Sequence, residues 1–216
     1  MNTLIAGLYA ITPDIADTDT LLLRTRAALT GGARVLQYRN KTASAALRRE
    51  QAMALQALCM EFAVPLIIND DLDLALAVDA AGLHLGSDDG DIAAARAQLG
   101  RTKLLGASCY DRIELAHSAV AAGADHIAFG SFFASSVKPG AVRPPVDLIS
   151  RAKKQFRLPV VAIGGITPHN APQLISAGVD AVAVISAVFT APDVAAAARE
   201  FQILFEHRHE KKSKAL

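Results

Sequence analysis

The sequence predicts a single α/β domain folded as a closed (β/α)8 TIM barrel. Eight short runs rich in Val, Ile and Leu alternate with eight Ala- and Leu-rich stretches along the 216 residues. Such alternation is typical of parallel strands joined by crossover helices. Several of the runs are apolar at nearly every position, which is expected of strands covered on both faces. Eight units favour a closed barrel over an open, doubly wound sheet, which remains the alternative fold.

Each predicted strand is a short apolar run, and each is followed by a longer stretch with helical spacing of its apolar residues. In order, the strands are residues 8–12, 34–39, 65–69, 82–86, 103–108, 126–130, 159–164 and 181–186. The helices are residues 17–29, 44–62, 72–78, 92–99, 113–122, 146–154, 171–177 and 194–205. We therefore expect the barrel domain to span residues 1–206 and a polar, basic, solvated tail to span residues 207–216.

The bulk properties favour an enzyme that acts on small molecules inside the cell. The formal net charge is +1 at pH 7, so no strong field attracts nucleic acid or an anionic membrane. No apolar stretch approaches the ~20 residues needed to span a bilayer, and the N-terminus lacks a signal-peptide pattern. Cys59 and Cys109 have no metal-like spacing and are predicted to be reduced thiols. We expect a cytoplasmic protein without nucleic-acid or membrane partners. A homodimer is possible, and the sequence does not decide the oligomeric state.

Polar and basic side chains end the second predicted strand. Alternate residues of a strand share a face, so Gln37, Arg39 and Lys41 are expected to point the same way. In this fold the active site lies at the carboxyl ends of the strands. Arg and Lys together suit a phosphate group, the former by its fork and the latter as a point charge. A charged strand end with solvated side chains is the alternative interpretation.

Acidic residues follow the third and fourth predicted strands. Asp70 and Asp89 would converge on one hard cation from these neighbouring strands. Mg²⁺ takes a few carboxylates, several waters and substrate phosphate oxygens. Asp71 and Asp88 would cap the helices that follow, for which Asp is favoured, and the two interpretations hold together.

Further polar groups lie at the ends of the next strands. Ser108 would orient a substrate or cap a turn, and no His–Asp pair marks it as a nucleophile. His84 is predicted to pack inside the barrel, since Mg²⁺ selects oxygen ligands. The connection at residues 130–145 is the longest irregular one, as lids and binding loops often are. Its Lys138 would add a cation above the barrel mouth.

The last two strands end in segments suited to a phosphate group. Gly164-Gly165 and Ile185-Ser186 occupy the positions where such barrels recurrently bind phosphate through backbone N–H groups and a helix N-terminus. Neither turn holds Lys or Arg, so we expect a monophosphate bound largely by amides. A cationic, metal-assisted site and a neutral backbone site at one mouth suggest a two-substrate transferase with diphosphate as the leaving group.

Taken together, these motifs resemble the thiamine phosphate synthase (thiamine-phosphate pyrophosphorylase) family. Each motif alone is weak, whereas the ordered set is specific and covers nearly the whole chain. The matching residues are Gln37-x-Arg39-x-Lys41, Asn69-Asp70, Gly82-x-His84-x-Gly86-x-x-Asp89, Gly106-x-Ser108, Lys138, Gly164-Gly165-Ile166 and Ile185-Ser186.

The resemblance implies a reaction, a cofactor and a role for each motif. The family joins 4-amino-2-methyl-5-(diphosphooxymethyl)pyrimidine to thiazole phosphate by a dissociative substitution assisted by Mg²⁺. The pyrimidine diphosphate would be held by Gln37, Arg39, Lys41, Asn69, Ser108 and Lys138, of which Arg39, Lys41 and Lys138 would be catalytic. Asp70 and Asp89 would ligate Mg²⁺. The thiazole phosphate would be bound by Ser135, Ser136, Val137, Gly165, Ile185 and Ser186.

One loop departs from the family pattern, and three other functions stay as alternatives. The family usually reads Pro-Thr-x-Thr-Lys where this chain has Ala134-Ser135-Ser136-Val137-Lys138, and a valine side chain cannot donate a hydrogen bond. A related thiazole tautomerase would not need the metal carboxylates or the diphosphate cations. A sugar-phosphate epimerase would need paired acid and base residues, and a non-catalytic phosphate-binding barrel is the third alternative.

Overall fold

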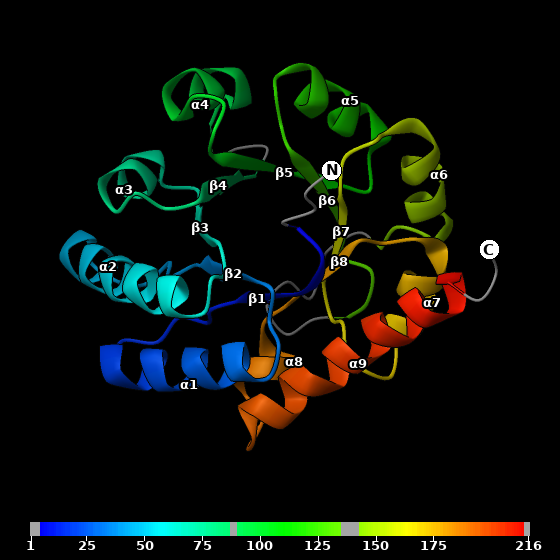
Figure 1. The fold of residues 1–216 in the computed structure, drawn as a ribbon. Coiled ribbons are helices and arrows are strands. Elements are labelled where there is room, and N and C mark those ends of the chain that lie inside the picture. The colour runs from blue at the N-terminus through cyan, green and yellow to red at the C-terminus, as the bar shows by residue number, and fades with distance from the viewer. Residues whose placement is uncertain (1–4, 87–89, 135–142, 214–216) are drawn as a thin grey trace.

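The structure is a computed structural model that describes residues 5–86, 90–134 and 143–213. It contains a closed barrel in which eight strands follow one another in sequence order. Helices surround the strands on the outside of the barrel (Figure 1). All neighbouring strands are parallel, and the last pairs with the first. The predicted (β/α)8 barrel is confirmed, and the doubly wound sheet is excluded because the sheet has no open edge.

Six of the strands are shorter than the apolar runs that predicted them, because the ends of those runs form loops, whereas β1 is as long as its run and β5 is longer. Their bounds are β1 Gly7–Ile11, β2 Val35–Tyr38, β3 Leu66–Asn69, β4 Gly82–Leu85, β5 Leu104–Tyr110, β6 His126–Phe129, β7 Val160–Ile163 and β8 Ala181–Val184. The register of β5 against β6 shifts between Ser108 and Tyr110. Tyr110 has a φ of 52° there, so the backbone turns sharply at the end of β5.

The helices lie where they were expected, with two differences. Their bounds are α1 Thr18–Thr30, α2 Ala45–Glu61, α3 Leu72–Ala77, α4 Ile92–Leu99, α5 Ile113–Ala121, α6 Asp147–Gln155, α7 Ala171–Ala177, α8 Ser186–Phe189 and α9 Val194–Ser213. The four-residue α8 begins at Ser186, which was predicted to end a strand.

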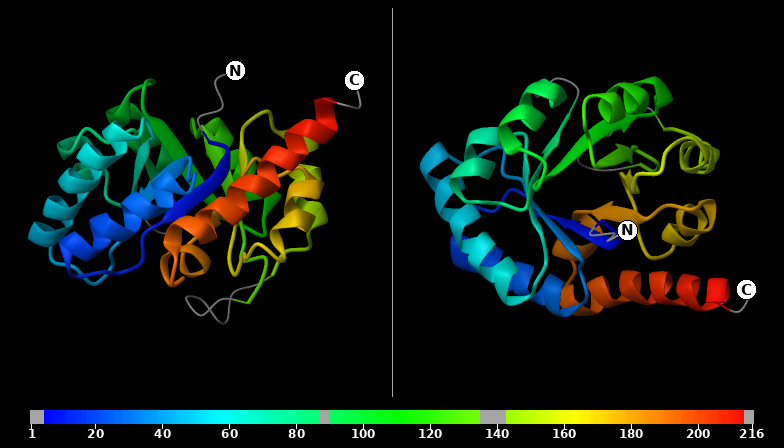
Figure 2. Two further views of the ribbon diagram at one scale, coloured as in Figure 1. Left: turned by 60° about the horizontal axis from the view of Figure 1, so that its bottom comes forward. Right: turned by 45° about the horizontal axis from the view of Figure 1, so that its top comes forward.

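The second difference is the length of α9. The helix continues to Ser213 instead of ending at residue 205, so most of the predicted tail is helical. No Gly or Pro occurs in this segment to end the helix. Figure 2 shows α9 running along one side of the barrel, and it packs against α1 and α7. None of the described helices is both long and apolar enough to cross a membrane.

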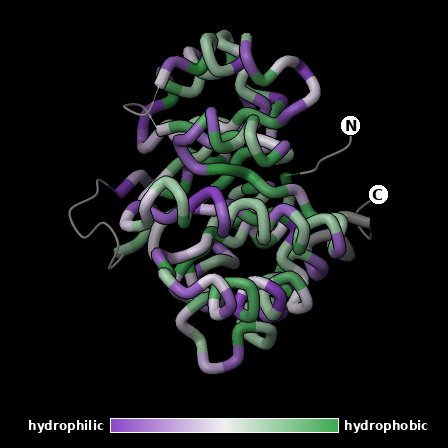
Figure 3. Tube along the Cα trace, turned by 90° about the vertical axis from the view of Figure 1, so that its left-hand side faces the viewer, coloured by the Kyte–Doolittle hydropathy of each residue, from purple (hydrophilic) through white to green (hydrophobic). Residues whose placement is uncertain are grey.

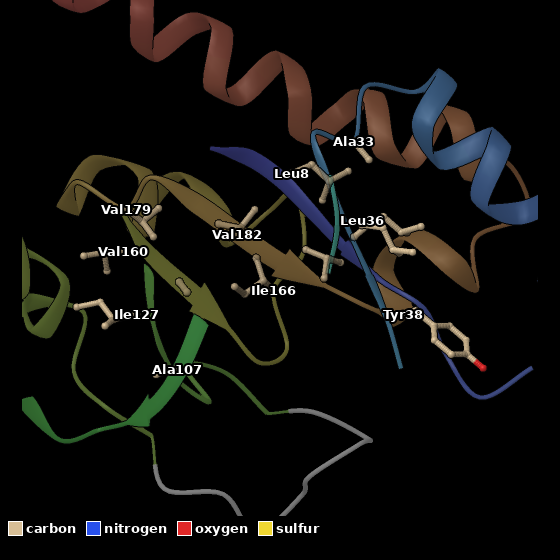
Figure 4. Packing of buried hydrophobic residues seen from close by; sticks show 14 of the residues in the cluster. Leu8, Ala33, Leu36, Tyr38, Ala107, Ile127, Val160, Ile166, Val179 and Val182 are labelled. Carbon is tan, nitrogen blue, oxygen red and sulfur yellow. The ribbon is translucent and has the colours of Figure 1, made fainter. Parts of the chain in front are cut away.

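The hydrophobic core has two parts, separated by the wall of the barrel. Alternate residues of each strand point inward and outward: Tyr9 and Ile11 of β1 pack inside the barrel, whereas Leu8 packs outside against the helices. Figure 4 shows Leu8 and Leu36 from neighbouring strands in the outer part. Figure 3 shows hydrophobic and hydrophilic segments side by side along the outer helices, as expected of helices buried on one side only.

The two cysteines lie within the outer part of the core. Cys59 and Cys109 are free and buried. Burial raises the pKa of each thiol to about 12. Free thiols were predicted, and such a pKa keeps them protonated and unreactive at neutral pH.

Candidate functional site

Polar side chains from several strands meet at the carboxyl end of the barrel, where this fold places its active sites. Gln37 of β2 is 4% exposed, and its Nε2 atom donates to the Tyr9 hydroxyl oxygen at 3.0 Å. Burial raises the pKa of Tyr9, and the hydrogen bond from Gln37 offsets part of that rise. The neutral phenol therefore fixes the position of the Gln37 amide inside the barrel.

The loop after β2 is held by a residue that the sequence did not single out. Asp14 lies after β1, and its Oδ1 atom is 3.2 Å from Nη1 of Arg39. The same oxygen accepts a hydrogen bond from the backbone N–H of Lys41 at 2.9 Å. Thr12 adds two hydrogen bonds to the backbone of Arg39. Asp14 thus orients both cationic residues, and only its place after a strand could have indicated it.

Three of the predicted site residues, Lys41, Asn69 and Asp70, lie together at the end of β3. The Lys41 Nζ atom lies 3.2 Å from Oδ2 of Asp70. The Asn69 amide donates to the same oxygen at 2.5 Å. Lys41 is far from Asn69 and Asp70 in the sequence. The parallel pairing of β2 with β3 brings the three residues together.

The adjacent aspartate points elsewhere. Asp71 accepts a hydrogen bond from the backbone N–H of Leu74 at 2.9 Å and caps α3. The capping role predicted for Asp71 is therefore confirmed. Its other oxygen lies 3.9 Å from Nη2 of Arg48.

A cleft of about 590 Å³ opens beside this cluster, between the segments that follow β2 and β3. Its walls carry both signs of charge, which suits an anion that arrives with a cation. The lining residues are Tyr38, Asn40, Lys41, Arg48, Ile68, Asn69, Asp70, Asp71, Leu72, Asp73 and Leu74.

Two imidazoles and a hydroxyl form a second polar group inside the barrel. His84 is 8% exposed, as its predicted packing requires. Its Nε2 atom lies 2.9 Å from Oγ of Ser108, and its Nδ1 atom lies 3.5 Å from Nε2 of His126. Burial, with a smaller contribution from His84, lowers the pKa of His126 to about 3. The sequence did not indicate His126, because it begins β6 at the end of the strand remote from the mouth.

The opposite side of the mouth is built from backbone. Gly165 has a φ of 59°, and a Cβ atom there would lie 2.2 Å from the carbonyl oxygen of Ala134. Asn170 donates to the Gly165 carbonyl oxygen at 3.0 Å and fixes this turn. Ile185 precedes the first turn of α8, and Ser186 begins it. The glycine therefore lets this turn pack closely against Ala134. The binding of a phosphate group by Gly165, Ile185 and Ser186 stays a prediction.

Several predicted site residues lie outside the described part of the chain. They are Asp89 and the loop residues Ser135, Ser136, Val137 and Lys138, together with Asp88 as a helix cap. Within the described part, no three His, Cys, Asp or Glu side chains gather as metal ligands. The carboxylate of Asp70 with the nearby Asn69 oxygen is a hard donor set that suits Mg²⁺ bound largely through water and phosphate.

A charged pocket and a backbone-built turn lie on opposite sides of one barrel mouth, an arrangement typical of a (β/α)8-barrel enzyme. The family model described as thiamine monophosphate synthase matches residues 8–188. The chain belongs to this family.

Three similar proteins agree with the chain over nearly its full length. Thiamine-phosphate synthase of Methylobacillus flagellatus is 57% identical over 93% of this chain and 96% of its own. The protein of the same name from Thiobacillus denitrificans is 53% identical over 95% of this chain and 97% of its own. Thiamine phosphate pyrophosphorylase from Pyrococcus furiosus is 35% identical, with a TM-score of 0.83, over 94% of this chain and 96% of its own.

Proposed function

We propose that this chain is a thiamine-phosphate synthase, a transferase that joins 4-amino-2-methyl-5-(diphosphooxymethyl)pyrimidine to 4-methyl-5-(2-phosphooxyethyl)thiazole. The products are thiamine phosphate and diphosphate. Family membership and the named relatives support the activity. The observation in the structure that carries the proposal is the meeting of Lys41 with Asp70, 3.2 Å apart, at the barrel mouth.

The cationic side of the mouth would bind the pyrimidine diphosphate. Arg39 and Lys41 supply positive charge where negative charge grows on the leaving diphosphate, and such oriented charge stabilises a transition state. Lys138 would join them from the loop after β6. Gln37, Asn69 and Ser108 would hold the substrate through hydrogen bonds.

Mg²⁺ would be held by Asp70 and Asp89 and by the diphosphate oxygens of the substrate. When bound, it supplies Lewis-acid stabilisation of the diphosphate charge. Lys41 lies against the Asp70 carboxylate. Its ammonium would contact a diphosphate held beside that carboxylate through the metal ion.

The reaction requires no general base from the protein. The bond between the methylene carbon and the diphosphate oxygen breaks, and its electron pair leaves with diphosphate. The aminopyrimidine donates electron density to the methylene cation, and the lone pair of the thiazole nitrogen then forms the new C–N bond. Ser135, Ser136, Val137, Gly165, Ile185 and Ser186 would hold the thiazole phosphate so that this nitrogen faces the carbon, which lowers the entropic barrier.

The assay combines purified protein, both phosphorylated substrates and Mg²⁺, and measures thiamine phosphate and diphosphate. We expect both products in equal amounts, with loss of activity on chelation and recovery on adding Mg²⁺. Interconversion of thiazole isomers without thiamine phosphate would instead establish a tautomerase. We place the reaction in the cytoplasm, with the two small molecules as the partners.

A further inference from the structure

His126 is buried inside the barrel at the amino end of β6, which is the end remote from the mouth. It is 0% exposed. Its Nδ1 atom has no contact with solvent and no hydrogen-bond partner among the residues that the structure describes. Its Nε2 atom faces Nδ1 of His84 at 3.5 Å, the outer limit of a hydrogen bond. The proposed substrate contacts do not include this residue, yet a polar side chain buried with one unpaired atom calls for a physical reason.

The two imidazoles meet because a glycine lies between them. His84, Gly106 and His126 are register partners in β4, β5 and β6. A Cβ atom on Gly106 would lie 2.2 Å from Nε2 of His126 and 2.5 Å from Nδ1 of His84. Any other residue at this position would push the two nitrogens apart.

The unpaired atom fixes which nitrogen of His126 carries the proton. A charged ring would bury an unpaired N–H in the apolar interior, so the ring is neutral. With the proton on Nδ1, that N–H would still be buried without an acceptor, which is rarer in proteins than an unfilled lone pair. The proton therefore belongs on Nε2, directed at His84.

The same order of hydrogen-bond donor and acceptor continues from His126 through His84 to the barrel mouth. His84 accepts at Nδ1 and so carries its own proton on Nε2. That N–H donates to Oγ of Ser108 at 2.9 Å. Ser108 lies two residues beyond Gly106 on β5, on the same face and nearer the mouth. Because its oxygen already accepts from His84, its own O–H is free to donate toward the substrate.

We propose that His126 is a positioning residue that sets the tautomer of His84 and thereby makes Ser108 a hydrogen-bond donor to a ring nitrogen of the aminopyrimidine substrate. The identity of the acceptor rests on the proposed function, whereas the order of donors within the protein does not. Such a bond is at least as strong in the bound substrate as in the transition state, where the ring gives up electron density. Its loss is therefore expected to raise KM without lowering kcat.

The first test needs no substrate. Side-chain ¹⁵N NMR of the wild-type protein at neutral pH reports which ring nitrogens carry protons, and His126→Phe and His84→Gln identify the signals. We expect both rings to be neutral, with the proton on Nε2. In His126→Phe, the His84 ring is expected to gain the tautomer protonated on Nδ1. A proton on Nδ1 of His126 or of His84 in the wild type would overturn the proposal.

The second test separates positioning from packing. His126→Phe fills the space without a donor, whereas His126→Gln offers an amide N–H in place of Nε2–H. We expect the phenylalanine variant to raise KM for the pyrimidine diphosphate about tenfold. KM for the thiazole phosphate should stay unchanged, and the glutamine variant should recover most of the loss. Thermal unfolding checks that both variants fold.

Equal losses in the two variants, or a fall in kcat alone, would mean that His126 only fills space. A wild-type protein that makes no thiamine phosphate would contradict the proposed function instead. The NMR result would still decide the order of donors in that case.

Discussion

Adjacent aspartates after β3 differ in role because the backbone turns sharply between them. Asp70 has a φ of 64°, in the left-handed region that Asp tolerates better than most residues. Its carboxylate faces Lys41, whereas the carboxylate of Asp71 caps α3. The residue types predicted both tasks. The turn that separates them depends on the packing of the chain around it, which a sequence pattern does not show.

Substitution should separate these two tasks. Asp70→Asn removes a charge from the proposed metal site and should lower turnover roughly 10²-fold, with a higher Mg²⁺ concentration needed for half-maximal rate. Asp71→Ala removes a helix cap and should lower the free energy of unfolding by about 1 kcal/mol. Initial rates over a Mg²⁺ series and urea unfolding of both variants check this. Equal losses of turnover would remove the distinction between them.

At the scale of elements, two aspartates tie neighbouring strands together at the amino end of the barrel. Asp125 precedes β6, accepts from the backbone N–H of Leu105 and pairs with Arg96. Asp180 precedes β8 and accepts from the backbone N–H of Val160 at 2.7 Å. This end of a (β/α)8 barrel serves stability, whereas the opposite end carries function.

Removing one of these aspartates should therefore lower stability and leave catalysis unchanged. Asp180→Ala leaves the Val160 N–H and the Lys153 ammonium, 2.6 Å from the carboxylate, without their partner. We expect a loss of about 2 kcal/mol in the free energy of unfolding, with kcat and KM unchanged at temperatures where the variant is folded. Urea unfolding and steady-state kinetics measure the two effects. A raised KM would show that the tie also shapes the mouth.

Elements were predictable to different degrees. Strands and long helices followed from apolar spacing. The short α8 did not, because Ser186–Phe189 is a single turn and gives no period to detect. The length of α9 was missed because its last turns are polar, and charge was taken to indicate solvated chain. Helix propensity favours continuing the helix there, because no Gly or Pro intervenes.

At the scale of the whole molecule, closure of the barrel creates an interior that excludes water, and the titratable ring of His126 is buried in it. The folded state lowers the pKa of His126 to about 3, while the unfolded chain titrates near the ordinary value of about 6.5. Between these values the unfolded state binds more protons. The free energy of unfolding therefore falls as the pH falls through this window.

Replacement of His126 should flatten that dependence. Relative to the wild type, His126→Gln should lose less stability on acidification from pH 7, with a difference of up to roughly 5 kcal/mol across the window. Urea unfolding at a series of pH values measures the difference, in which other titrating groups common to both proteins cancel. If the free energy of unfolding changed with pH in the same way for both proteins, the His126 ring would take up its proton in the folded state with the same pKa as in the unfolded chain.

The sequence by itself determined the barrel, the end of it that carries the chemistry, and the family, because apolar periodicity and residue type at strand ends are local properties of the chain. Only the tertiary structure decided which polar groups pair. Asp14 reaches Arg39, and His126 reaches His84 across Gly106. These contacts join residues far apart in the chain, so they depend on the register of parallel strands and on the closure of the sheet.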